Sequence, residues 1–176
     1  MKKLISVILV LIIIFLGYSG HQMKEREEKN INYVASKINE NVLDLGRYAG
    51  SLKGDFINQA SLDRVYVHIE MLVNQIDQDI DTLKFMDPEL DITLDEMIYH
   101  YVHLMDKMTY GIDRFRAVEL MDELNVYIQL YAECGIFSME NSYETLMLRD
   151  EFINKKISEL GSEKYRNMCL EIMSVK

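Results

Sequence analysis

The residues best suited to chemistry lie in one short stretch, in which Glu96, His100 and His103 follow one another at helical spacing. On a helix, all three side chains fall within a sector of about 60°. One carboxylate and two imidazoles are ligands that zinc and copper accept in proteins. The sector lies about 130° from the apolar stripe of the same helix, so we expect it to face solvent or a partner. A surface metal site is one hypothesis, and an ordinary solvated helix face is the interpretation that we favour.

No other arrangement of residues indicates catalysis. Neither Cys134 nor Cys169 has a histidine close to it in the sequence, and no glycine pattern typical of a nucleophile elbow is present. A glycine-rich phosphate loop is also missing, because the glycines from Gly46 to Gly54 lie within a helical pattern and not between a strand and a helix. We therefore predict a protein that is not an enzyme and that needs no cofactor.

The two cysteines leave two alternatives open. In an oxidising exterior, Cys134 and Cys169 could form one disulfide that closes the last two helices. Two buried free thiols explain the sequence equally well, and the spacing is not one that metal sites use.

The elements that position these residues are all expected to be helices. Apolar residues recur at helical spacing from Ile31 onward, and no stretch alternates with the period of a strand. A capping box at Thr93 and Glu96, the Asp87-Pro88 pair and Gly161 mark helix ends. The predicted helices span residues 31–56, 61–86, 93–131, about 138–160 and 162–172. We predict an all-α fold: an antiparallel bundle of about four long helices, the last one broken, preceded by an N-terminal hydrophobic signal or anchor helix.

Three glycines at intervals of four, Gly46, Gly50 and Gly54, interrupt the first predicted helix. Each costs about 1 kcal/mol relative to alanine in a helix interior. We interpret them as helix-packing residues that let a neighbouring helix approach closely, or that let two copies of the chain form a homodimer. The alternative is that the helix weakens and turns at this point.

The start of the chain predicts export. Lys2 and Lys3 precede an apolar run from Leu4 to Leu16 that is interrupted only by Ser6. This run is short for a spanning helix, which needs about 20 residues. We predict a signal peptide or N-terminal membrane anchor over residues 1–20, with residues 4–18 in the membrane, and an extracytoplasmic domain over residues 21–176. The alternative is secretion after cleavage near Ser19.

Composition supports one acidic domain. The chain of 176 residues has a formal net charge of −10, and its basic residues include Lys2 and Lys3. An acidic surface repels nucleic acid, so we expect no nucleic-acid partner. A single proline and the lack of a Gly/Ser-rich linker argue against a second domain.

The function predicted first is protein interaction. Tyr99 and Tyr110, with His103 between them, line the side of the third predicted helix that faces away from its core stripe. Exposed tyrosines suit interfaces, because they offer a large contact area at little entropic cost. We predict an exported, membrane-tethered helical bundle that docks a protein partner at or outside the membrane.

The alternative function is ligand sensing. In outline, residues 20–176 resemble the four-helix extracytoplasmic sensor domains of bacterial chemoreceptors and histidine kinases, which also begin as a helix rising from the membrane. The sequence departs from that pattern, because we identify no second spanning segment and no cytoplasmic signalling part in these 176 residues. The resemblance therefore implies a ligand-binding bundle that passes its state to a separate signalling protein.

Overall fold

The computed structural model describes residues 2–51, 59–110, 114–132, 134 and 141–176. The side chains of residues 2–14, 49–51, 59–66, 108–110 and 114–115 lie outside that description. The described chain is all-helical and contains no strand. Its helices are α1 (Lys2–Ser51), α2 (Gln59–Met86), α3 (Thr93–Tyr110), α4 (Arg114–Ala132), α5 (Ser142–Leu160) and α6 (Ser162–Ser174).

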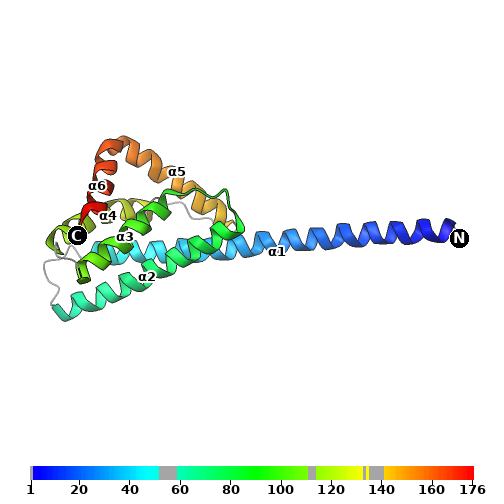
Figure 1. Ribbon diagram of the computed structural model, residues 1–176, viewed down its shortest axis with the longest axis horizontal. Coiled ribbons are helices and arrows are strands. Elements are labelled where there is room, and N and C mark those ends of the chain that lie inside the picture. Colours follow the sequence, from blue (N-terminus) through cyan, green and yellow to red (C-terminus); the bar gives the residue numbers. More distant parts are fainter. Residues whose placement is uncertain (1, 52–58, 111–113, 133, 135–140) are drawn as a thin grey trace.

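The longest helix, α1, extends well beyond the rest of the molecule. Its N-terminal part projects away from the other helices, and α2 runs back along its C-terminal part (Figure 1). Of the described side chains of α1, the first that is buried belongs to Val34. Because α1 is continuous from Lys2 to Ser51, the boundary predicted at residue 20 between the signal or anchor segment and the domain lies inside this helix. Among the residues that the structure describes, no helix is long and apolar enough to cross a membrane. The side chains of residues 1–14 are not among those described.

The core lies where α1 meets α2, α4 and α5, and where α3 packs on α2 and α4. Isoleucine, leucine and valine at helical spacing fill it from α1 and α2, which is the reason that these segments are amphipathic helices. The residues that these two helices contribute are Val34, Ala35, Ile38, Val42, Leu45, Ile69, Val73, Ile76, Ile80 and Leu83.

The prediction of one helix over residues 93–131 is wrong, because two helices occupy this stretch. The hydroxyl of Tyr101 in α3 donates a hydrogen bond to Oδ1 of Asn125 in α4, over 2.6 Å. In a continuous helix, these two residues would be separated by about 36 Å along the axis. Since α3 and α4 pack against each other, both of their apolar stripes face the same core.

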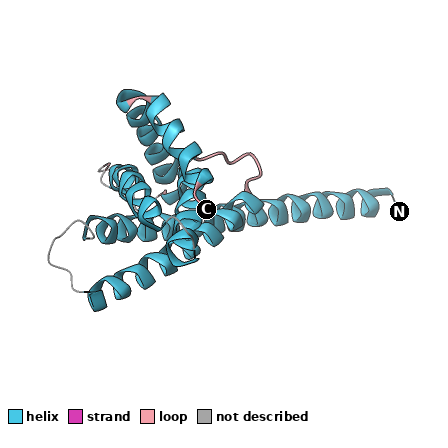
Figure 2. Ribbon diagram, turned by 60° about the vertical axis from the view of Figure 1, so that its left-hand side comes forward, coloured by secondary structure: helices cyan, strands magenta, loops and turns pink. Residues whose placement is uncertain are grey.

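Several predicted helix ends agree with the structure. Helix α2 ends at Met86, directly before Asp87-Pro88, and α3 begins at Thr93. Gly161 separates α5 from α6 with a φ of 107°, a left-handed conformation that glycine adopts without strain. In Figure 2 the described loops, among them residues 87–92 between α2 and α3 and Gly161 between α5 and α6, are pink.

Close packing distinguishes Gly46 in α1. A Cβ placed on this residue would lie 2.6 Å from Cβ of Ala132 in α4, which is closer than two non-bonded carbon atoms can approach. Helix α4 therefore lies directly against the backbone of α1 here. The side chain environment of Gly50 and the whole of Gly54 are outside the described residues.

Candidate functional site

The residues predicted as metal ligands do not share one solvent-facing surface. His100 is buried, with 5% of its surface exposed, whereas Glu96 is exposed and His103 is half-buried. The expectation that His100 faces solvent is therefore wrong. His100 lies on the side of the sector nearest the core, about 100° from the centre of the α3 core stripe, so a neighbouring helix can cover it. Helix α6 packs against α3 and contributes the cover that the sequence did not reveal.

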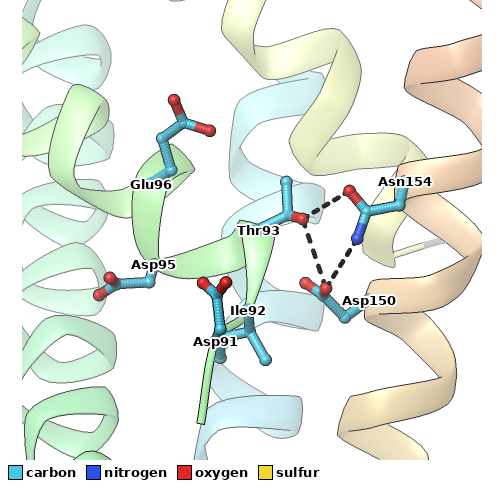
Figure 3. Close-up of a pocket in the computed structure, with 7 residues that line it drawn as sticks. All are labelled: Asp91, Ile92, Thr93, Asp95, Glu96, Asp150 and Asn154. Atoms are coloured by element: carbon cyan, nitrogen blue, oxygen red, sulfur yellow. Dashed lines mark hydrogen bonds between the residues drawn. The ribbon is translucent and has the colours of Figure 1, made fainter. Parts of the chain in front are cut away.

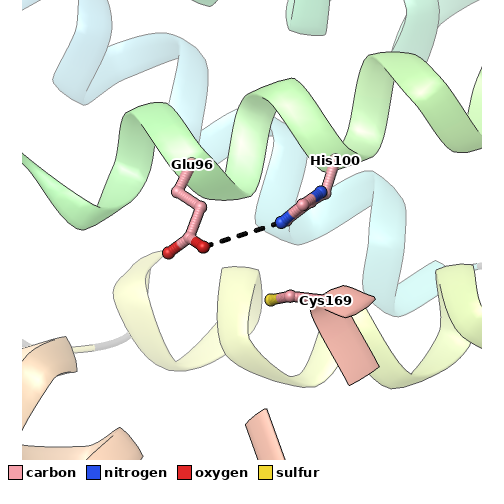
Figure 4. A group of neighbouring side chains, drawn as sticks. All are labelled: Glu96, His100 and Cys169. Atoms are coloured by element: carbon pink, nitrogen blue, oxygen red, sulfur yellow. Dashed lines mark ion pairs between the residues drawn. The ribbon is translucent and has the colours of Figure 1, made fainter. Parts of the chain in front are cut away.

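The structure brings Glu96 and His100 together with Cys169 of α6. The carboxylate, a ring nitrogen and the sulfur all lie within 4.8 Å of one another. Within this group, Oε1 of Glu96 is 3.7 Å from Nε2 of His100. Figure 4 shows the two α3 side chains on the same side of the helix, with Cys169 approaching from α6. His103, one turn further along, does not belong to this group.

Burial dominates the electrostatics of the group. Loss of water lowers the pKa of His100 below its ordinary value, although the neighbouring Glu96 carboxylate acts in the opposite direction. Burial also raises the pKa of the Cys169 thiol to about 11, and the negative charge of Glu96 adds to this effect. At neutral pH, burial therefore favours the neutral imidazole of His100 and the protonated thiol of Cys169.

Packing and one ion pair hold α6, and with it Cys169, in place. The ring of Tyr165 meets the ring of Tyr127 in α4 edge to face, with centroids 4.9 Å apart. On the outer side, Nε of Arg116 in α4 donates to Oε1 of Glu171 over 2.7 Å. Cys169 is thus positioned by contacts on both sides of its helix.

A second feature, an acidic pocket of about 370 Å³, opens next to this group at the N-terminus of α3 (Figure 3). Residues of the α2–α3 connection, of α3 and of α5 line it. They are Asp91, Ile92, Thr93, Asp95, Glu96, Asp150 and Asn154. Glu96 therefore borders both the pocket and the group with His100 and Cys169.

Several residues that line the pocket also form hydrogen bonds that hold the start of α3 against α5. Oδ1 of Asp150 accepts a hydrogen bond from the backbone N–H of Leu94 over 3.2 Å, at the first turn of α3. Asn154 donates to Oδ2 of the same carboxylate over 3.0 Å and accepts from the hydroxyl of Thr93 over 2.7 Å. Burial nevertheless raises the pKa of Asp150, which these hydrogen bonds only partly offset. Asp95 pairs with Lys84 of α2.

The residues predicted for a partner interface are only partly described. Tyr99 is 55% exposed on α3, and its ring centroid lies 5.8 Å from that of His100. Nε2 of His103 is buried and has no hydrogen-bond partner. The side chain of Tyr110 lies outside the described residues.

Both cysteines are free thiols, Cys134 half-buried and Cys169 buried. Sequence reasoning missed the proximity of Cys169 to His100, because the two residues lie far apart in the chain. The one available indication was its place on the apolar stripe of the last helix, which predicts an inward-facing side chain. The position of Cys169 on that stripe does not indicate which other helix the side chain contacts.

In comparisons with known proteins, the chain matches no family model, no curated protein and no solved structure.

Proposed function

We propose that this protein is a non-enzymatic, exported helical bundle that is tethered to a membrane by its N-terminal segment and docks a protein partner. The observation that carries this proposal is the continuity of α1. One helix of about 75 Å joins the apolar run that begins at Leu4 to the core residues that begin at Val34. Cleavage after Ser19 would cut inside that helix, so its continuity favours a retained anchor over a removed signal peptide.

The segment between the apolar run and the domain suits a spacer. Residues 20–30 are all exposed, and charged side chains occupy every position from Lys24 to Lys29. Such a helix gains little from packing and is stabilised in water by its polar surface. Its length of about 16 Å would hold the domain away from the membrane surface.

The face proposed for the partner is the exposed side of α3. Tyr99 offers an exposed aromatic ring there, on a helix that the core holds rigidly through Met97, Ile98 and Tyr101. A rigid, amphipathic ring loses little entropy on binding, which is the reason that tyrosine is common in interfaces. His103 and Tyr110 follow Tyr99 on the same side of the helix by spacing.

Cell fractionation followed by intact-mass measurement tests the tether. We expect a membrane-bound species that still carries residues 1–19. A released species that begins near Gly20 would contradict the proposal and would favour secretion.

Photo-crosslinking tests the docking face. A crosslinking residue at position 99 should capture a membrane or extracytoplasmic protein, and Tyr99→Ser should abolish co-purification of the same protein. Tyr33→Ser is the matched control, because Tyr33 is 63% exposed but lies on α1. Capture that survives Tyr99→Ser, or that is lost equally in Tyr33→Ser, would contradict the proposed face.

The second candidate function is sensing of a small cationic ligand, in line with the architecture of extracytoplasmic sensor domains. The pocket at the N-terminus of α3 favours it, because Asp91 and Glu96 are exposed carboxylates at its edge. A thermal-shift screen against amines, amino acids and divalent metals discriminates, because a bound ligand raises the melting temperature. If Asp91→Asn leaves every such shift unchanged, the pocket is not the binding site.

A further inference from the structure

The feature that no role so far explains is the imidazole of His100. Its side chain is 7% exposed, and both ring nitrogens are buried without a hydrogen-bond partner. The closest charged atom, Oε1 of Glu96, is 3.7 Å from Nε2, which is too far for a hydrogen bond. Buried polar atoms in proteins nearly always have a partner, and for a neutral imidazole a metal ion is a common one.

The donor atoms around this ring are already near the spacing that a metal requires. Around a tetrahedral zinc ion with bonds of about 2.0–2.3 Å, neighbouring donor atoms lie about 3.3–3.8 Å apart. The separation of 3.7 Å between Glu96 and His100 falls in this range. The sulfur of Cys169 lies within 4.8 Å of both, so a shift of about 1 Å would bring it into reach.

We propose that Glu96, His100 and Cys169 form a zinc-binding site that links α3 to α6. Carboxylate oxygen, imidazole nitrogen and thiolate sulfur are all zinc ligands, and the thiolate disfavours magnesium and calcium. On binding, the thiol of Cys169 releases its proton to solvent and the sulfur takes up the metal bond. Water fills the fourth position, since Glu96 leaves one side of the site open to solvent.

The helical arrangement suits this assignment. Glu96 and His100 lie four positions apart on α3, a spacing that places two ligands on one helix face. The third ligand comes from a helix near the end of the chain. Zinc would therefore connect α3 directly to α6, which otherwise contacts α3 through side-chain packing and is held to α4 by the Arg116–Glu171 ion pair.

Titration of the full-length, reduced protein in detergent with Co²⁺, a spectroscopic substitute for zinc, tests the site. We expect a sulfur-to-cobalt charge-transfer absorption in the near ultraviolet, which zinc then abolishes by displacement. Cys169→Ser should remove this absorption and lower the affinity by more than about 100-fold, since changes to groups around a ligand already cost 10–100-fold. Cys134→Ser is the matched control and should keep both the charge-transfer absorption and the metal affinity.

Two further variants keep the test independent of folding. Glu96→Gln changes an exposed side chain, so it should leave the circular dichroism spectrum unchanged while weakening metal binding at least about 10-fold. His103→Gln should bind the metal as the unmodified protein does, because His103 lies outside the group. The proposal is overturned if reduced protein shows no thiolate–cobalt absorption, if Cys169→Ser retains it, or if His103→Gln removes it while Glu96→Gln does not.

Discussion

At the scale of single residues, the start of α3 depends on an aspartate from a different helix. Asp150 of α5 is 5% exposed and accepts the backbone N–H of Leu94, one of the donors that a helix N-terminus leaves without an intrahelical partner. The hydroxyl of Thr93 donates to Asn154. The first turn of α3 is therefore capped from across the domain.

Replacing Asp150 should destabilise the fold. In Asp150→Ala, the buried N–H of Leu94 loses its acceptor, and we expect the free energy of unfolding to fall by about 1–3 kcal/mol. Urea denaturation followed by circular dichroism measures the change. Asp91→Ala, at an exposed residue of the same pocket, should change it by less than about 0.5 kcal/mol. Equal effects of the two substitutions would show that the cap contributes little.

The sequence predicted the start of α3 but not its capping partner. A capping box is a local signal, so Thr93 and Glu96 sufficed to place the N-terminus of the helix. The hydrogen bond to Asp150 joins residues that are distant in the chain, and no local pattern encodes it. The same limitation hid the meeting of His100 with Cys169, which depends on where α6 packs.

At the scale of elements, the close crossing of α1 and α4 constrains both helices. Gly46 and Ala132 lie where a second methyl group has no room. Neither partner can yield easily, because the Cβ of an alanine is fixed to its backbone. The two helix axes would have to separate to admit a larger residue.

Gly46→Ala should therefore lower stability in spite of the better helix propensity of alanine. Overpacking costs about 1–3 kcal/mol, against a gain of about 1 kcal/mol from propensity. Thermal unfolding should show a lower melting temperature for Gly46→Ala and a partial recovery in the double variant Gly46→Ala with Ala132→Gly. Gly17→Ala is the control, because a Cβ there meets no atom within 4 Å. A melting temperature of Gly46→Ala at or above that of the unmodified protein would contradict the packing.

Helical periodicity predicted the all-α class but not the break between α3 and α4. The apolar stripes of α3 and α4 face the same core, so the helical repeat continues in the sequence from one helix to the next with only a small shift. The stops at Asp87-Pro88 and Gly161 were recognised because the stripes also end there.

At the scale of the whole molecule, the domain and the projecting half of α1 should be separable. The partly buried side chain of Ile31 already packs against the core, fully buried side chains begin at Val34, and the backbone N–H of Tyr143 in α5 donates to Oδ1 of Asn32 over 3.1 Å. Residues before Asn30 contribute no buried side chain among those that the structure describes. The stability of the domain therefore depends on the C-terminal part of α1.

A truncated chain that begins at Asn30 should keep the helical content per residue and the urea midpoint of the domain. A chain that begins at Asn39 loses the buried side chains of Val34, Ala35 and Ile38, and we expect a loss of about 3–5 kcal/mol. Equilibrium unfolding of both chains provides the measurement. A large loss of stability in the longer chain would show that the projecting segment belongs to the folded unit.

The unbroken course of α1 also has a rotational consequence. In a single helix, each residue between the apolar run and Val34 turns everything beyond it by about 100°. One alanine inserted between Glu27 and Glu28 would lengthen this segment of α1 by only about 1.5 Å. It would also rotate the domain, and Tyr99 with it, by about 100° around the axis of α1. Seven inserted residues would restore the rotational orientation of the domain to within about 20° while lengthening α1 by about 10 Å. In the membrane-tethered arrangement proposed above, the number of residues in this segment therefore sets the rotational orientation of the domain, and with it the side of the domain that a neighbour in the same membrane would meet.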